Sequence, residues 1–318
     1  MKKVFFISLQ TIIIGLVLMT SCATGKVAPP EHNFSFAVLA DPRNQGASWK
    51  NALVEIRDGT VNTEPAFMPV ELIVVAGDMD PLKLRYEDYL SVFTNAVTSP
   101  ILLPVIGNHE FGNSAVHFRY ARDVLIPSIP GAVCRHDKSC DYYLDHGNVR
   151  IIVIDSYTDV GKNGVVNDEG RQWVEKIIKA TPLSIDHIFI SFHEPAFPRY
   201  RHVGNSFDLN PKLRNAFWNM LLENKDRVRA ILVGHTHRYS RMRVLDPAGK
   251  DANDPKTFPD EEGGIYQIDA GAAGNGEVNT IVQVQVEGKN LFFRVLQAKN
   301  GSNMPFAEID KWSIIPNP

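Results

Sequence analysis

The chain has 318 residues, of which 44% are hydrophobic and 22% charged; this is enough apolar sequence to bury a core and excludes an intrinsically disordered chain. Its 33 basic and 36 acidic residues give a net charge of −3, which argues against a large basic surface for nucleic acid. Three cysteines are too few for a small disulfide scaffold, and their odd number needs an explanation.

The first 21 residues are typical of a secretory signal. Lys2 and Lys3 precede a 16-residue apolar run, Val4 to Met19, which is shorter than the roughly 20 residues of a membrane-spanning helix. The run ends in Leu-Met-Thr-Ser-Cys at residues 18–22, which resembles the lipobox of bacterial lipoproteins. In such proteins the signal is cut before the cysteine, and the thiol receives a lipid.

The resemblance implies a signal peptide over residues 1–21, lipidation of Cys22 and a tether over residues 22–33. The protein would then sit in the bacterial cell envelope, lipid-anchored to the outer membrane or facing the periplasm. An uncleaved anchor helix and ordinary signal cleavage are the alternatives.

The remaining cysteines, Cys134 and Cys140, lie six positions apart. An oxidising periplasm would allow them to form a disulfide, which we expect. A metal site formed by both cysteines and His136 is the alternative, but it lacks the further ligands that zinc requires.

Short apolar runs alternate with amphipathic segments from residue 34 onward. This pattern predicts one mixed α/β domain over residues 34–318. Expected strands are 34–40, 71–76, 101–106, 142–145, 149–155, 187–192, 228–233, 264–268, 280–286 and 291–297, and expected helices are 49–57, 86–97, 168–180 and 210–224.

Polar residues follow five of these strands directly. Because ligands gather outside the carboxyl ends of strands in α/β sheets, we expect these residues to meet at one place. Their oxygen and imidazole donors suit Zn, Mn or Fe, and glycines before several of them would allow sharp turns. The residues are Asp41, Asp78, Asn108, His109, His193, His235 and His237.

In order and spacing, this series resembles the calcineurin-like metallophosphoesterase family. The resemblance implies a four-layer β-sandwich flanked by helices, two divalent metal ions and a phosphate-ester substrate. Asp78 would bridge both ions, Asn108, His193 and His235 would complete one site, and Asp41 and His237 would belong to the other. The resemblance also implies that His109 stabilises the transition state or protonates the leaving oxygen.

One position departs from the family pattern, which usually begins Asp-x-His. Here Asp41 is followed by Pro42 and Arg43, and a guanidinium has no lone pair for a metal. Three arrangements are consistent with this change: water fills the first site, a neighbour such as Asn44, Gln45 or Asp80 replaces the histidine, or Arg43 binds a substrate phosphate. We favour a weak first site with Arg43 at the phosphate.

Two further segments concern the substrate and the metal. Pro81 stands where purple acid phosphatases carry a tyrosine, so we do not expect an iron–tyrosinate centre. The segment Pro198–His202, Pro-Arg-Tyr-Arg-His, is either a solvated loop or a set of contacts to phosphate and base.

Two functions are consistent with these residues. The first is a metal-dependent phosphoesterase acting on phosphomonoesters or phosphodiesters, with Arg43 and His109 in its catalytic machinery. The second is a degenerate relative that uses the fold for binding or as a scaffold. The second rests on Arg43 alone, so retention of the other site residues favours the enzyme.

Overall fold

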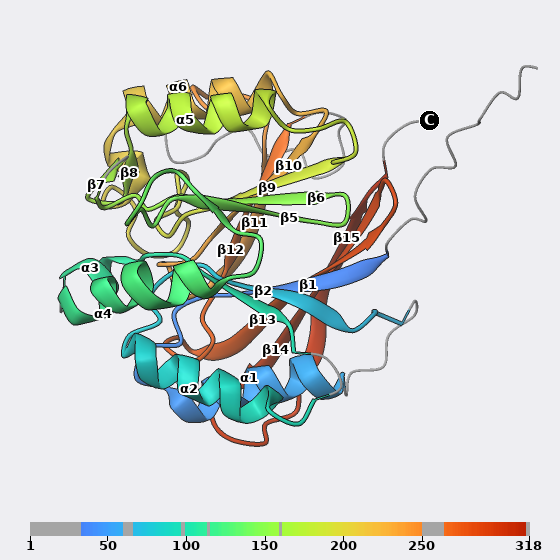
Figure 1. Ribbon diagram of the computed structural model, residues 1–318. Coiled ribbons are helices and arrows are strands. Elements are labelled where there is room, and N and C mark those ends of the chain that lie inside the picture. Colours follow the sequence, from blue (N-terminus) through green and yellow to red (C-terminus); the bar gives the residue numbers. More distant parts are fainter. Residues whose placement is uncertain are drawn as a thin grey trace, which may run out of the picture. The chain divides into compact units, whose positions relative to one another are not determined.

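The computed structural model describes residues 33–59, 66–96, 99–112, 115–158, 161–249 and 264–315. All of these residues fall in one compact unit that begins at Glu31. Two β-sheets stacked face to face form its centre, and helices cover their outer faces (Figure 1). The predicted signal, tether and Cys22 lie outside the described residues.

The first sheet has six strands, of which β1, β2 and β3 run parallel and the other three complete the sheet with antiparallel pairings. The order across it is β15 (Ala307–Ile314), β14 (Asn290–Lys299), β13 (Val278–Glu287), β1 (Phe34–Leu39), β2 (Val70–Val75) and β3 (Ile101–Pro104).

The second sheet has seven strands, with a parallel centre of β12, β10, β9 and β6. The order is β11 (Tyr239–Val244), β12 (Ile265–Ala270), β10 (Val228–Val233), β9 (His187–Ser191), β6 (Val149–Val153), β5 (Tyr142–His146) and β4 (Val133–Cys134). A separate two-stranded ribbon joins β7 (Gly161–Lys162) to β8 (Val165–Val166).

Helices α1 (Gly46–Asp58) and α2 (Leu82–Phe93) cover the six-stranded sheet, while α5 (Asp168–Lys179) and α6 (Pro211–Leu222) cover the seven-stranded one (Figure 1). The sequence helps to define where α5 and α6 begin, because Asn167 and Asn210 cap their first turns through side-chain oxygens. This helix–sheet–sheet–helix order confirms the four-layer fold.

Short helical segments make the remaining connections. They are α3 (Asn108–Gly112), α4 (Ala115–Tyr120), a π-helical turn (Ala121–Leu125), and 3₁₀ turns at Ile126–Ser128 and Phe207–Leu209. Among the described residues, no helix has the length and apolar character needed to cross a membrane.

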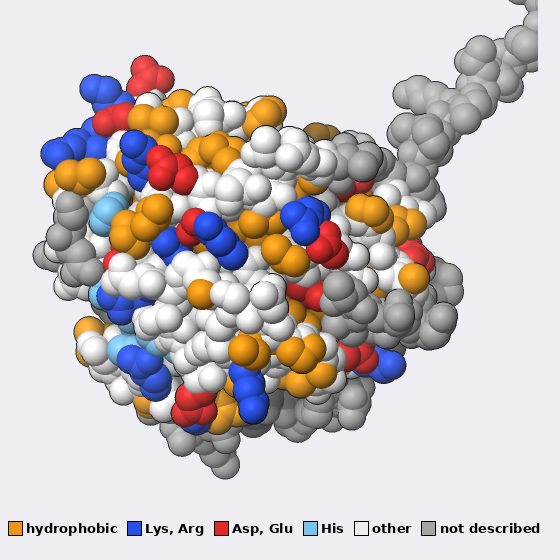
Figure 2. Space-filling model, turned by 90° about the horizontal axis from the view of Figure 1, so that it is seen from below, with side chains coloured by type: hydrophobic (Ala, Val, Ile, Leu, Met, Phe, Trp, Pro, Cys, Tyr) orange, Lys and Arg blue, Asp and Glu red, His pale blue; other side chains and the backbone are white. Residues whose placement is uncertain are grey.

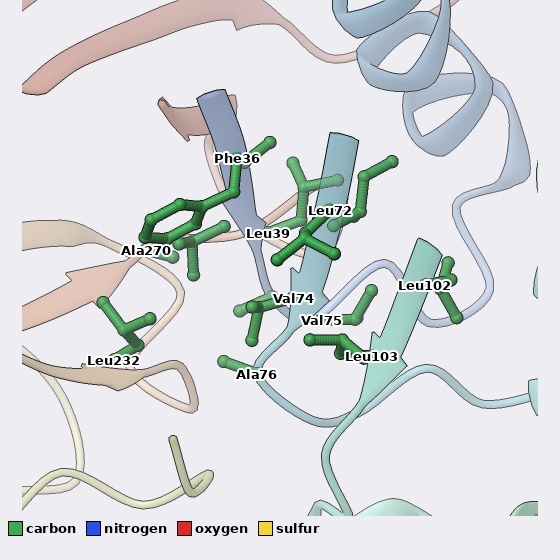
Figure 3. Close-up of a cluster of buried hydrophobic side chains, with 14 of the residues drawn as sticks. Phe36, Leu39, Leu72, Val74, Val75, Ala76, Leu102, Leu103, Leu232 and Ala270 are labelled. Atoms are coloured by element: carbon green, nitrogen blue, oxygen red, sulfur yellow. The ribbon is translucent and has the colours of Figure 1, made fainter. Parts of the chain in front are cut away.

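Apolar side chains from both sheets fill the space between them. Figure 3 shows Phe36 of β1 and Val74 of β2 near Leu232 of β10 and Ala270 of β12. The Phe36 ring meets that of Phe189 on β9 edge to face, with centroids 5.0 Å apart, a favoured aromatic geometry. This shared core fixes one sheet on the other and therefore fixes the loops at their ends.

The strands predicted from the sequence do not include the edge strands β4, β11 and β15, or the short strands β7 and β8. Along β15 exposed and half-buried residues alternate without a fully buried position, so the strand has no apolar run for a pattern search to find. On the face shown in Figure 2, acidic and basic side chains are interspersed and do not gather by sign.

No disulfide joins the two described cysteines, of which Cys134 is partly exposed and Cys140 is buried. The expected disulfide is therefore absent from the structure and stays a prediction. If the bond forms in the oxidised protein, neither cysteine reacts with a thiol reagent after denaturation without reductant, and both react after reduction. Labelling of either residue before reduction would exclude the bond.

His187 gives the fold a testable dependence on pH. Its ring is buried between the Gly288 carbonyl, 2.9 Å from Nε2, and the Arg229 guanidinium, 3.1 Å from Nδ1. Burial, the largest cause, lowers the pKa of His187 to about 4. As the pH falls through about 6.5 the unfolded chain binds a proton before the folded chain does, so stability present above that pH is lost toward pH 4.

We expect this loss to reach about 3 kcal/mol. Urea unfolding at pH 7 and at pH 4.5 measures it, with His187→Gln as the comparison. The variant should lose less stability than the native chain over that interval. Equal losses in the two proteins would exclude His187 as the cause.

Candidate metal centre

The loops after five parallel strands bring the predicted residues together. Asp41 follows β1, Asp78 follows β2, and His237 lies in the loop after β10. One donor atom from each of these three residues lies within 4.8 Å of the other two. We call this group site A. The next loops, after β3 and β9, supply Asn108 and His193 beside it.

Site A has the donors of a cation site. Asp41 is buried, and its Oδ2 accepts the backbone N–H of His235 at 2.9 Å. Its Oδ1 lies 3.3 Å from His237 Nε2 and accepts no hydrogen bond from the described residues. An unsatisfied buried carboxylate oxygen is costly, and a divalent ion would satisfy it.

Three donor atoms surround Nε2 of the buried His193, and we call these four residues, which include Asp78 of site A, site B. Asp78 Oδ1 lies 3.3 Å from this nitrogen, Asn108 Oδ1 3.2 Å and His235 Nδ1 3.3 Å. On the other side of the ring, Nδ1 lies 2.7 Å from the Ala76 carbonyl and donates to it. This contact orients the ring as in metal-ligating histidines.

The electrostatics of site B favour positive charge. Burial disfavours ionisation of both Asp78 and His193, but their mutual attraction outweighs it, lowering the pKa of Asp78 and raising that of His193. Burial and then the neighbouring His193 and His202 lower the pKa of His235 to about 2. The site thus combines a retained carboxylate with a neutral imidazole, both of which can bind a metal.

Backbone strain concentrates at the same place. Of the nine non-glycine residues with positive φ in the described part of the chain, six belong to the site or its rim. Such conformations cost roughly 1–3 kcal/mol each and persist where the surroundings enforce them. The six are Asp41 (φ 51°), Arg43 (38°), Asp78 (54°), His202 (58°), His235 (72°) and His237 (59°).

The glycines before the ligands have a different role from the one expected. Of the three glycines Gly77, Gly107 and Gly234, only Gly77 has a positive φ, 92°. Gly107 and Gly234 are required for space, because a Cβ would lie 2.3 Å from Asp78 Oδ1 at the first and 2.6 Å from the Ala40 Cβ at the second. Close approach, not a sharp turn, is therefore the reason for these two.

Two buried carboxylates hold the ligand loops without joining either site. Glu110 Oε2 accepts the N–H groups of Gly107 and Asp78 at 2.9 and 3.0 Å, and burial raises its pKa to about 8. Asp269, at the end of β12, accepts the Thr236 hydroxyl at 2.6 Å. Sequence reasoning missed Asp269, although its place at the end of a buried strand could have revealed it.

Arg43 lies beside site A as a cation. Its Nε donates to Asp80 Oδ1 at 3.2 Å, so Asp80 pairs with the arginine and is absent from the donor cluster. Arg43 lines an open pocket of about 490 Å³ with Arg201, His237 and Arg238. The pocket therefore joins site A to three guanidinium groups.

The segment Pro198–His202 divides between two places. Arg201 and His202 reach the candidate centre, where the His202 and His235 rings lie with centroids 4.1 Å apart. Arg199 and Tyr200 line a neighbouring pocket of about 400 Å³ instead.

His109 lies next to Asp78, the residue that sites A and B share. Its backbone N–H donates to Asp78 Oδ1 at 3.0 Å, and its Nε2 is 3.7 Å from Asp78 Oδ2. The side chain remains 22% exposed, so it can meet a substrate.

Known structures share this fold at low sequence identity. A purple acid phosphatase from yellow lupin (Lupinus luteus) seeds superposes with a TM-score of 0.61 and 13% identity over 89% of this chain. This chain covers only 54% of the lupin enzyme. PhoD superposes with a TM-score of 0.55 and 10% identity, over 89% of this chain and 73% of PhoD. No curated protein matches the sequence.

The family assignment rests on sequence as well as fold. The model of the calcineurin-like phosphoesterase family matches residues 34–239, a span that contains both donor groups. The strand-end ligands, the four layers and this match agree. The chain therefore belongs to the calcineurin-like phosphoesterase family.

Proposed function

We propose that this protein is a metal-dependent phosphoesterase that hydrolyses phosphomonoesters or phosphodiesters. The observation that carries the proposal is the pair of donor groups that share Asp78, with the partly exposed His109 beside them. Family membership supports the same class of reaction. An arginine-lined pocket opens from site A, and its charge suits a phosphate.

Two divalent ions, Mn, Fe or Zn, would be held by these residues. Asp41, Asp78 and His237 would hold the first, and Asp78, Asn108, His193 and His235 the second. Bound there, the ions would acidify water and neutralise charge on the phosphate oxygens. Arg43 replaces a ligand of the first ion with a cation, so we propose that this ion binds more weakly than the second.

The protein's own groups supply binding and proton transfer. Arg43 can bind a phosphate oxygen through its donors while Asp80 holds it beside the pocket. His109 is placed to donate a proton to the leaving oxygen, because its ring is partly exposed next to Asp78. Glu110 keeps the Asp78 and His109 loops in register by accepting two backbone N–H groups.

Hydrolysis of p-nitrophenyl phosphate and of bis(p-nitrophenyl) phosphate with Mn²⁺ tests the proposal. We expect activity on at least one ester that disappears with a chelator. His109→Ala should lower kcat by roughly 10²–10⁴-fold, the usual contribution of an acid or base. His117→Ala, in the neighbouring α4, is the matched control and should retain activity.

The ratio of the two rates distinguishes a monoesterase from a diesterase. Background rates on both esters with metal present, together with no effect of His109→Ala, would instead favour the degenerate binding protein.

We further propose that the protein is a lipoprotein of the bacterial cell envelope, which rests on residues 18–22. Expressed in a bacterium, the native chain should partition with membranes and carry lipid on Cys22. Cys22→Ser should lose both properties, whereas Cys134→Ser should keep them. Membrane association of the Cys22→Ser chain, or an unmodified Cys22 in the native one, would contradict this proposal.

A further inference from the structure

His237 differs from His193 in what its ring can offer a metal ion. The Arg201 side chain places Nη1 2.7 Å from His237 Nδ1. A guanidinium has donors and no acceptor, so Nδ1 accepts this hydrogen bond and the ring hydrogen lies on Nε2. That second nitrogen lies 3.3 Å from Asp41 Oδ1 without forming a hydrogen bond to it. The contact with Arg201 therefore occupies Nδ1 and fixes the ring hydrogen on Nε2.

A metal ligand needs a ring nitrogen with a lone pair that no hydrogen bond uses. If Nε2 binds the ion, the hydrogen moves to Nδ1 and points at a group that can only donate. If Nδ1 binds the ion, the Arg201 guanidinium occupies the ion's place. Either way, the Arg201 contact and an ion ligated by His237 exclude each other. His193 has no such conflict, because its Nδ1 faces a carbonyl.

The surroundings of Arg201 indicate what could move it. Arg43 pairs with Asp80 and Arg238 with Glu277, but no carboxylate pairs with Arg201 within the described residues. All three guanidinium groups line the 490 Å³ pocket beside site A. A phosphate dianion in this pocket is a better partner for Arg201 than a neutral imidazole is.

We propose that Arg201 is a positioning residue that competes with the first metal ion for His237, and that phosphate binding to Arg201 releases the ring. Phosphate and the first ion then bind cooperatively, each raising the affinity for the other. The proposal rests on the assignment of site A made above. It adds a reason, independent of Arg43, for a weak first site.

Calorimetric titration of the purified, metal-free full-length protein with Mn²⁺ tests this. The native chain should bind one ion tightly at site B and one ion weakly at site A. Arg201→Met keeps an apolar stem and removes the donors, so the site A ion should bind about tenfold more tightly, the equivalent of one charged hydrogen bond. Arg199→Met is the matched control, because it removes the same charge two residues away and should leave both affinities unchanged.

A second arm uses inorganic phosphate. Phosphate should strengthen binding of Mn²⁺ at site A to the native chain more than to Arg201→Met, in which His237 is already released. Adding His237→Ala to Arg201→Met should abolish the gain. Thermal unfolding confirms that each variant is folded.

The outcomes distinguish failure of the Arg201 proposal from failure of the phosphoesterase proposal. An unchanged affinity of site A in Arg201→Met, or an equal gain in Arg199→Met, overturns the role of Arg201 and leaves the phosphoesterase proposal standing. Binding of no ion by the folded native chain and both variants overturns both proposals.

Discussion

The site depends on the burial of two like charges. Asp41 and Asp78 follow adjacent parallel strands, and their carboxylates are hidden from solvent within a few ångströms of each other. Two carboxylates so placed cannot both stay ionised without cations or donors nearby. The backbone N–H groups of His235 and His109 donate hydrogen bonds to the two carboxylates. The imidazole rings of the site surround the carboxylate oxygens as well. The remaining groups of the site stabilise the negative charge of these two buried carboxylates.

The parallel pairing of the strands explains why several residues of the site could be predicted from the sequence. An apolar run followed by a glycine or a polar residue is visible in one dimension, and parallel strands convert that order into proximity. Asp41, Asp78, Asn108 and His193 were therefore predictable. Contacts that depend on the direction of a side chain could not be predicted in this way. The contact of Arg201 with His237 joins a long loop to the end of a strand, and nothing in the sequence spacing indicates it. The edge strand β15 was missed because it has no apolar run and its apolar residues do not keep a regular two-residue spacing.

The two donor groups draw on both halves of the sandwich. Asp41, Asp78 and Asn108 come from the six-stranded sheet, whereas His193, His235 and His237 come from the seven-stranded one. Their relative placement therefore depends on how the sheets pack, and contacts such as Phe36 with Phe189 set it from within the core. A core substitution far from the ligands can thus change the site by shifting one sheet against the other.

The residues of site A combine a strained backbone with the side chains that supply its donor atoms. The backbone conformation lowers the stability of the fold at the same residues that the site requires. Glycine adopts positive φ without strain, so replacing Asp41 or His237 by glycine would relax the chain locally while it removed a donor. The positive φ of Asp41 and of His237 therefore places two donor atoms of site A at positions where the main chain gives up local stability.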